Sequence, residues 1–192
     1  MNGEALRPEQ GYPARLVVPG WEGNMWVKWI RRLEFGDKPY MTREETSKYT
    51  DLLRDGKARM FTWVMEAKSV VTSPSPEKPI LHKGIQQLRG LAWSGKGKIK
   101  RVDVSLDGGK NWRTAQLHAP IMSKSLVRFT LPFEWSGEEL LIQSRAIDET
   151  GYVQPYIQEL QKIRGKNSIY HNNSIATWLV SKSGRVDNVR LG

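Results

Sequence analysis

The chain has 192 residues, of which 39% are hydrophobic, and it contains no cysteine. The length predicts one domain, or one and part of another, and the hydrophobic share argues against a disordered chain, while the lack of cysteine excludes disulfides, zinc–thiolate sites and a cysteine nucleophile. The net charge of +10 comes from interspersed basic and acidic residues without a like-charged block, which favours a generic basic surface over nucleic-acid binding.

The amino terminus lacks the basic and apolar segments of an export signal, and no run of roughly 20 apolar residues could cross a bilayer. Asn2 and Gly3 predict a turn between structured segments, as though the chain starts within a fold. Met1 is therefore either the true start or an internal residue of a longer protein. The missing signal indicates the cytoplasm only in the first case.

Residues 1–60 predict mixed structure. Residues 14–19 form a short apolar strand that Pro19-Gly20 ends, and residues 27–30 predict another strand, although neither has an obvious partner here. Thr42 and Glu45 have the spacing of a capping box, which predicts a helix that continues to about Leu53. Asp55-Gly56 then predicts a turn.

From Met60 onward the pattern becomes almost purely β. Residues 72–79 are rich in proline, which cannot donate to a central strand ladder, so we expect a linker-like crossover between two domains at about residues 68–80. The predicted division is residues 1–60 and residues 61–192.

The second part contains short strands at regular spacing. Residues 99–106 alternate and place Val102, Val104 and Leu106 on one face, which predicts a half-buried strand. Residues 107–110, Asp-Gly-Gly-Lys, predict a hairpin, because glycine adopts positive φ without a steric penalty. Further strands are expected at residues 127–131, 140–147, 175–180 and 185–189. This pattern predicts a mainly β protein with an immunoglobulin-like β-sandwich.

The same sandwich segment resembles a known family. Residues 93–97 (Trp-Ser-Gly-Lys-Gly), 101–105 (Arg-Val-Asp-Val-Ser) and 107–112 (Asp-Gly-Gly-Lys-Asn-Trp) are similar to the dimerisation domain of sulfite-oxidase-type molybdenum oxidoreductases. From the residues alone, this hairpin is structural, with Trp112 packed beneath it. The resemblance implies that residues 61–192 form the homodimer contact.

Residues 11–20 and 27–29 resemble the α+β tail of the molybdopterin-binding domain of the same family. The resemblance implies that Arg15 and Lys28 contact the molybdopterin cofactor, whose phosphate suits a guanidinium fork and a compact ammonium charge. From the residues alone, both would be solvated surface charges. Gln10 stands where the family often has histidine, which puts a cofactor contact by its side chain in doubt.

Tyr49 aligns with the active-site tyrosine of this family, and Arg164, in the loop of residues 164–173, with an arginine that reaches the anion site above molybdenum. The resemblance therefore implies that Tyr49 and Arg164 lie on the substrate side, with Lys48 making this side more cationic. The alternative for Tyr49 is a helix tyrosine at the surface. His171 is expected to support the loop rather than bind a metal, and no metal ligand is predicted.

Residues 12–29 and 145–155 are most similar to family members that act in bacterial sulfur oxidation. The resemblance implies a periplasmic parent enzyme that oxidises sulfite or protein-bound sulfane sulfur and passes two electrons to a c-type cytochrome. In the family a cysteine thiolate holds molybdenum, so the chain alone is expected to be inactive. The alternative is a non-catalytic immunoglobulin-like binding or dimerisation module with a basic surface; motifs of P-loop, dinucleotide-binding and serine-hydrolase proteins are missing.

Overall fold

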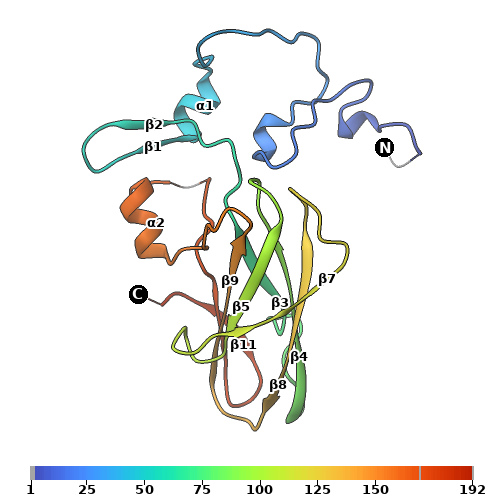
Figure 1. Cartoon of the computed structure of the whole chain (residues 1–192), viewed down its shortest axis with the longest axis vertical. Helices are drawn as coiled ribbons and strands as arrows, with labels where there is room; N and C mark the ends of the chain where they lie inside the picture. Colours follow the sequence, from blue (N-terminus) through green and yellow to red (C-terminus); the bar gives the residue numbers. More distant parts are fainter. Residues whose placement is uncertain (1–2, 169, 192) are drawn as a thin grey trace.

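The computed structural model describes residues 3–168 and 170–191. Its larger part is a sandwich of two antiparallel sheets (Figure 1). The first sheet has the order β11-β10-β9-β5-β6, with β5 at Ile99–Ser105, β6 at Arg113–Thr114, β9 at Leu140–Asp148, β10 at Thr177–Val180 and β11 at Val186–Val189. The second has the order β3-β4-β8-β7, with β3 at Lys68–Ser73, β4 at Gly84–Trp93, β7 at Gln116–His118 and β8 at Val127–Trp135.

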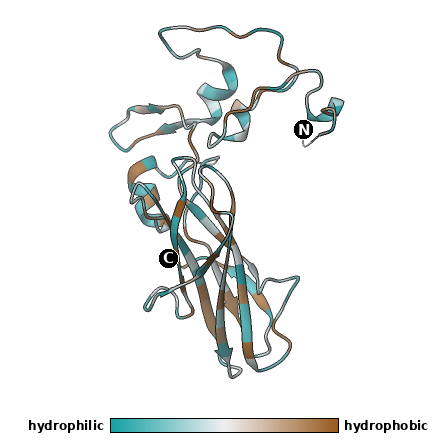
Figure 2. Ribbon diagram, turned by 45° about the vertical axis from the view of Figure 1, so that its right-hand side comes forward, coloured by the Kyte–Doolittle hydropathy of each residue, from teal (hydrophilic) through white to brown (hydrophobic). Residues whose placement is uncertain are grey.

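The hydrophobic core lies between these two sheets. Strand β8 alternates strictly, so Phe129 and Leu131 point inward and Arg128 points to solvent. Val102 of β5 and Ile142 of β9 meet them from the other sheet and are fully buried. Apolar residues accordingly recur along the strands of the sandwich (Figure 2). The predicted mainly β, immunoglobulin-like sandwich is confirmed.

Strand β5 is more buried than its alternation predicts. Val102 and Val104 face the core as expected, but the opposite face is also covered, and Asp103 is only 4% exposed. Arg101 and Arg145 cover its carboxylate, at 3.0 and 3.3 Å. The prediction of a half-buried strand was wrong because ion pairs across the strands can bury a polar face.

The predicted hairpin after β5 is confirmed. Gly108 and Gly109 have φ values of 75° and 94°, and Asp107 closes the turn by accepting hydrogen bonds from the amides of Lys110 and Asn111 at 3.0 and 2.9 Å. Trp112 packs there as expected, and its indole donates to the Gly109 carbonyl.

The proline-rich segment connects two strands of one sheet. Residues 68–73, expected to begin the linker, form β3, which pairs with β4. The prolines of this segment follow the strand rather than interrupt it, and the domain crossover expected at about residues 68–80 stays a prediction. The division into residues 1–60 and 61–192 stays a prediction.

The amino-terminal part contains little regular structure: short 3-10 helices at Pro8–Gln10 and Gly23–Met25, helix α1 at Arg43–Lys48, and strands β1 at Thr50–Leu52 and β2 at Ala58–Met60. The strands expected at residues 14–19 and 27–30 do not form. These segments instead meet each other through one bridge between Arg15 and Lys28. The expectation that they have no partner in the chain was also wrong.

The helix predicted after Thr42 is shorter than expected. It ends at Lys48, and Thr42 makes no side-chain cap hydrogen bond, so the predicted capping box and the extension to Leu53 were wrong. Residues after Tyr49 pair as the β1–β2 hairpin, which competes with further helix. The predicted Asp55-Gly56 turn is confirmed by a Gly56 amide bond to the Leu53 carbonyl and a φ of 80°.

Side-chain burial differs sharply between the two parts. Each buried hydrophobic residue of the described chain lies at residue 67 or beyond. Residues 3–60 instead carry large exposed apolar side chains, among them Trp29 and Tyr40, and Phe35 is 89% exposed. The amino-terminal part therefore has no hydrophobic core of its own. Among the described residues, no helix is long and apolar enough to span a membrane.

Candidate functional site

Arg15 and Lys28 form a cationic pair on facing segments. The Arg15 guanidinium donates to the main-chain carbonyls of Gln10 and Trp26 at 3.1 and 3.2 Å, and the Lys28 ammonium donates to the Glu9 carbonyl at 2.7 Å. Gln10 therefore contacts Arg15 through its main-chain carbonyl. Neither cation has a carboxylate partner among the residues that the structure describes.

The surroundings of this pair fit an anionic group. The Nε atom of Arg15 is buried without a hydrogen-bond partner in the described chain. Gly11 has a φ of 107°, and a Cβ atom there would lie 3.0 Å from the Lys28 Cβ atom, so glycine allows the segments of Arg15 and Lys28 to pack closely against it. Two adjacent cations and an unused donor suit the phosphate of a pterin cofactor.

Tyr49 lies at the end of α1, beside an aromatic residue of the distant loop. Its ring centroid is 5.3 Å from that of Tyr170, and the Lys48 ammonium donates to the Tyr170 hydroxyl at 3.2 Å. Burial raises the pKa of Tyr49, and the charge of Glu22 raises it further, so its phenol stays protonated at neutral pH. No role for Tyr170 was predicted from the sequence.

Arg164 is the last residue of helix α2 (Ile157–Arg164), and its side chain is 3% exposed. One terminal nitrogen donates to Asp51 Oδ2 and Thr62 Oγ1, both at 2.9 Å. The other lies 3.2 Å from Glu66 Oε2. Arg164 thus joins α2 to the amino-terminal part, with two carboxylates balancing its charge. Its predicted catalytic role stays a prediction.

Arg164 also lines a cavity of about 260 Å³. Its lining includes Arg164, Trp63, Arg59, Lys96 and Glu66. The Nε atom of Arg164 and the Nε1 atom of Trp63 are both buried without an acceptor within the described residues. Three cationic side chains and one carboxylate line this cavity, and two lining residues carry a buried donor without an acceptor, which suits an anion.

His171 joins the same network. It is buried, with Nδ1 2.8 Å from Glu22 Oε1 and Nε2 3.2 Å from Glu66 Oε2. These contacts fix the loop to both parts of the chain. Within residues 3–168 and 170–191, no group of three or more His, Cys, Asp or Glu side chains could hold a metal ion.

The pKa values of Glu66 and His171 in this network are shifted in opposite directions. Burial alone would raise the pKa of Glu66, but the hydrogen bond from His171 and the charge of Arg164 outweigh it and lower this pKa to about 2. Burial alone would lower the pKa of His171, but its hydrogen bonds to Glu22 and Glu66 raise it above the usual value.

These shifts predict a stability maximum in mildly acid solution. The Glu66 contribution is lost as pH falls below 4.5 toward 2, and the His171 contribution is lost as pH rises above 6.5 through its raised pKa. We expect urea midpoints to decline on both sides of that window. His171→Gln should remove much of the alkaline decline, whereas His82→Gln, at an exposed position, should not; equal profiles for the two variants would contradict this.

Sequence reasoning missed Asp51, Glu66 and Trp63. Asp51 lies two residues after Tyr49, and Glu66 is the one charged residue in the otherwise mostly apolar stretch of residues 61–67. An acidic residue in such a stretch needs a partner when it is buried, so the position of Glu66 in the sequence could have indicated a buried ion pair. The partner itself, Arg164, could not be read from the sequence.

Comparison with known proteins places these features in context. Residues 59–178 match the model of the Mo-co oxidoreductase dimerisation domain, and residues 1–44 match that of the oxidoreductase molybdopterin binding domain. The chain is 64% identical to the sulfane dehydrogenase SoxCD from Paracoccus pantotrophus, whose crystal structure superposes with a TM-score of 0.94 over 100% of this chain and 49% of that chain.

Curated relatives are more distant and longer. Sulfite oxidase of Gallus gallus is 34% identical over 169 residues, which cover 81% of this chain and 36% of the relative. Nitrate reductase [NADH] 2 of Nicotiana tabacum is 32% identical over 187 residues, covering 80% of this chain and 20% of the relative. The chain thus spans about half, or less, of the proteins that it matches.

Proposed function

This chain belongs to the Mo-co oxidoreductase dimerisation-domain family, and from that premise we propose that it is the C-terminal part of a molybdenum-dependent sulfite or sulfane dehydrogenase of bacterial sulfur oxidation. Similarity to the SoxCD sulfane dehydrogenase and to sulfite oxidase supports this choice of substrate. The parent protein would work in the periplasm as a homodimer through the sandwich, with a c-type cytochrome as electron acceptor.

Residues 1–60 would complete a molybdopterin-binding domain. Their exposed apolar side chains, such as Phe35 and Trp29, have no core to join in residues 3–168 and 170–191. The hydrophobic effect favours covering such a surface with the remainder of that domain. Arg15 and Lys28 would then hold the cofactor phosphate, since neither forms an ion pair with a described carboxylate. When bound, the cofactor supplies the two-electron redox chemistry.

The substrate would lie toward the cavity beside Arg164, and this cavity is the observation that carries the proposal. Arg164 Nε and Trp63 Nε1 would donate to the oxygens of an anionic sulfur group. Asp51 and Glu66 bind the two terminal nitrogens and fix the orientation of the guanidinium. Arg164 would therefore bind the anion through Nε while its terminal nitrogens stay paired with these carboxylates. Tyr49, with its protonated phenol, would add a neutral donor on the same side.

The second candidate is a non-catalytic immunoglobulin-like binding or dimerisation module with a basic surface. One observation favours it: every buried hydrophobic residue found in the described chain lies at residue 67 or beyond, so the second part has a hydrophobic core that needs no cofactor. A module of this kind would bind its partner equally well without molybdenum.

The test uses the longer protein that contains this chain, loaded with molybdenum cofactor. We expect it to reduce a c-type cytochrome when sulfite or a carrier-bound sulfane is added, and we expect the 192-residue chain alone to be inactive because it has no cysteine thiolate to offer molybdenum. Sulfur oxidation by the chain alone would contradict the fragment proposal. Absence of molybdenum from the longer protein would favour the binding module.

A variant pair tests the cofactor residues. Arg15→Gln with Lys28→Gln removes two charge-assisted contacts, so we expect cofactor affinity to fall by about 100-fold or more. The measurement is molybdenum content after gel filtration, which does not depend on turnover. Arg31→Gln with Arg32→Gln removes two exposed cations nearby and should retain molybdenum. Equal retention by both double variants would remove Arg15 and Lys28 from the cofactor site.

A further inference from the structure

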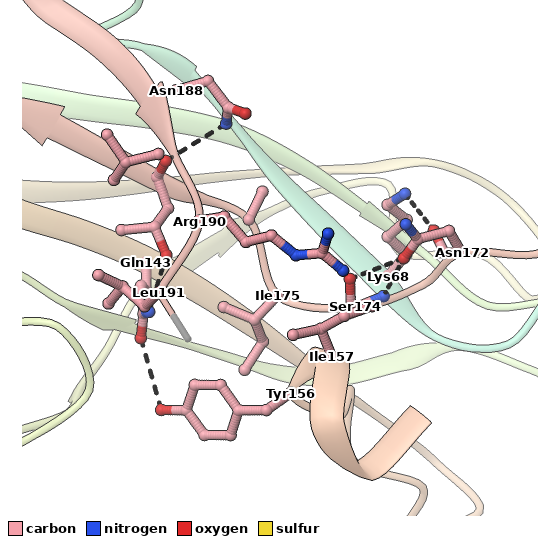
Figure 3. A pocket seen from close by; sticks show the side chains of 13 residues that line it. Lys68, Gln143, Tyr156, Ile157, Asn172, Ser174, Ile175, Asn188, Arg190 and Leu191 are labelled. Atoms are coloured by element: carbon pink, nitrogen blue, oxygen red, sulfur yellow. Dashed lines mark hydrogen bonds between the residues drawn. The ribbon is translucent and has the colours of Figure 1, made fainter. Parts of the chain in front are cut away.

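A second cavity lies on the flank of the sandwich, away from residues 1–60 in sequence. Its volume is about 290 Å³, near the lower end of the range for small-molecule pockets. The start of α2 forms one wall, and the segments before β10 and after β11 form others (Figure 3). Chain segments from both sheets and from a helix therefore converge on it.

Two cations reach this cavity. Lys68 comes from the start of β3 and Arg190 from the residue after β11, and Figure 3 shows the Arg190 side chain extended in the direction of Ser174 and Lys68. The residues that line the cavity include no Asp or Glu. Like charges that converge without a carboxylate between them create a positive potential in the cavity.

Both cations keep unused donors. The Lys68 ammonium donates to the main-chain carbonyl of Asn172, which leaves two of its three protons free. Lys68 is half-buried, and burial lowers its pKa, while the charge of Glu22, which does not line this cavity, acts in the opposite direction. An anion in the cavity would offset more of the cost of burying this charge. Arg190 makes no hydrogen bond or ion pair with any described residue, so its planar guanidinium fork is available.

The uncharged residues that line the cavity indicate the chemistry of the rest of the ligand. Ser174 and Tyr156 contribute hydroxyls fixed by hydrogen bonds to Asn172 Oδ1 and Gln143 Oε1 at 2.7 and 3.4 Å. The lining also includes the apolar residues Ile157, Ile175, Val189 and Leu191, beside the polar side chains of Thr177 and Asn188. A ligand that matches this lining has a charged oxyanion head and a short apolar body.

We propose that this cavity binds a small organic oxyanion, a carboxylate or sulfonate with a short apolar body, between Lys68 and Arg190. The guanidinium of Arg190 would hold two oxygens of the head group, and Lys68 would supply a point charge on the other side. The apolar body would lie on Ile175 and Leu191. Occupancy would not require molybdenum.

The test is calorimetric titration of the full-length protein with benzoate, methanesulfonate, inorganic sulfate and benzylammonium at constant ionic strength. We expect saturable one-to-one binding of benzoate, weaker binding of the two anions with less apolar surface, and none of benzylammonium. Arg190→Gln should weaken benzoate binding about tenfold or more, because a hydrogen bond to a charged group is lost.

Controls separate this site from nonspecific charge. Lys182→Gln removes an exposed cation of the β10–β11 hairpin that does not line the cavity, and it should leave benzoate binding unchanged. Lys68→Gln gives a second test on the opposite wall, and Arg190→Gln stays informative if that variant does not fold. No saturable anion binding, or equal binding by Arg190→Gln and wild type, would overturn the proposal. Neither outcome bears on molybdenum retention.

Discussion

Replacing Arg164 with methionine should lower the free energy of unfolding by about 3–5 kcal/mol. The guanidinium is buried between Asp51 and Glu66, and its removal leaves both carboxylates in a poorly solvated place with one cation fewer. Methionine fills much of the same volume, so the expected loss reports the missing charge rather than a cavity. The effect is large because burying an unpaired charge costs more than an exposed ion pair contributes.

Urea unfolding followed by tryptophan fluorescence measures this loss. Arg185→Met is the matched control, since Arg185 pairs with Asp187 at 2.9 Å but both side chains are exposed. We expect the control to lose less than about 1 kcal/mol. Equal losses for the two variants would show that the Arg164 contacts do not stabilise the chain.

The Arg164 variant should also loosen the amino-terminal part. Asp51 belongs to β1, and Thr62 follows β2, so the guanidinium connects this hairpin to α2 of the sandwich. We expect limited proteolysis to cut between residues 3 and 60 sooner than in the wild type, while the sandwich stays intact.

Local patterns predicted most of the sandwich. The Asp107-Gly108-Gly109 turn forms because each residue acts on neighbours within four positions. Strand β8 follows from strict alternation, which every residue of the strand repeats independently. Such signals are short in range and redundant, so the sequence carries them plainly.

The candidate site depends on contacts that no local pattern records. Arg164 meets Asp51 across 113 positions, and His171 meets Glu22 across 149. The resemblance directed attention to Arg164, but its carboxylate partners became visible only in the structure. The expected strand at residues 14–19 failed for a related reason: an apolar run becomes a strand only where a neighbouring strand offers a continuous ladder, and here a single bridge is available.

Gln154→Leu should cost about 2–6 kcal/mol, because it removes the acceptor for two buried amides. The side-chain Oε1 accepts from the amide of Ser69 on β3 at 2.8 Å and from that of Ala146 on β9 at 3.0 Å, and β3 and β9 belong to different sheets. Leucine has a similar size but no acceptor, so both amides would stay buried without a partner.

Two measurements check the role of Gln154. Urea unfolding should show the loss, and amide hydrogen exchange should accelerate most at Ser69 and Ala146, which are 1% and 0% exposed. Gln87→Leu is the control: this glutamine is exposed on β4 and its side chain makes no hydrogen bond to another described residue, so the change in free energy should stay within about 0.5 kcal/mol. If Gln154→Leu behaved like this control, the sheets would be held by apolar packing alone. We expect instead that one buried polar side chain fixes how the two sheets of the dimerisation domain meet.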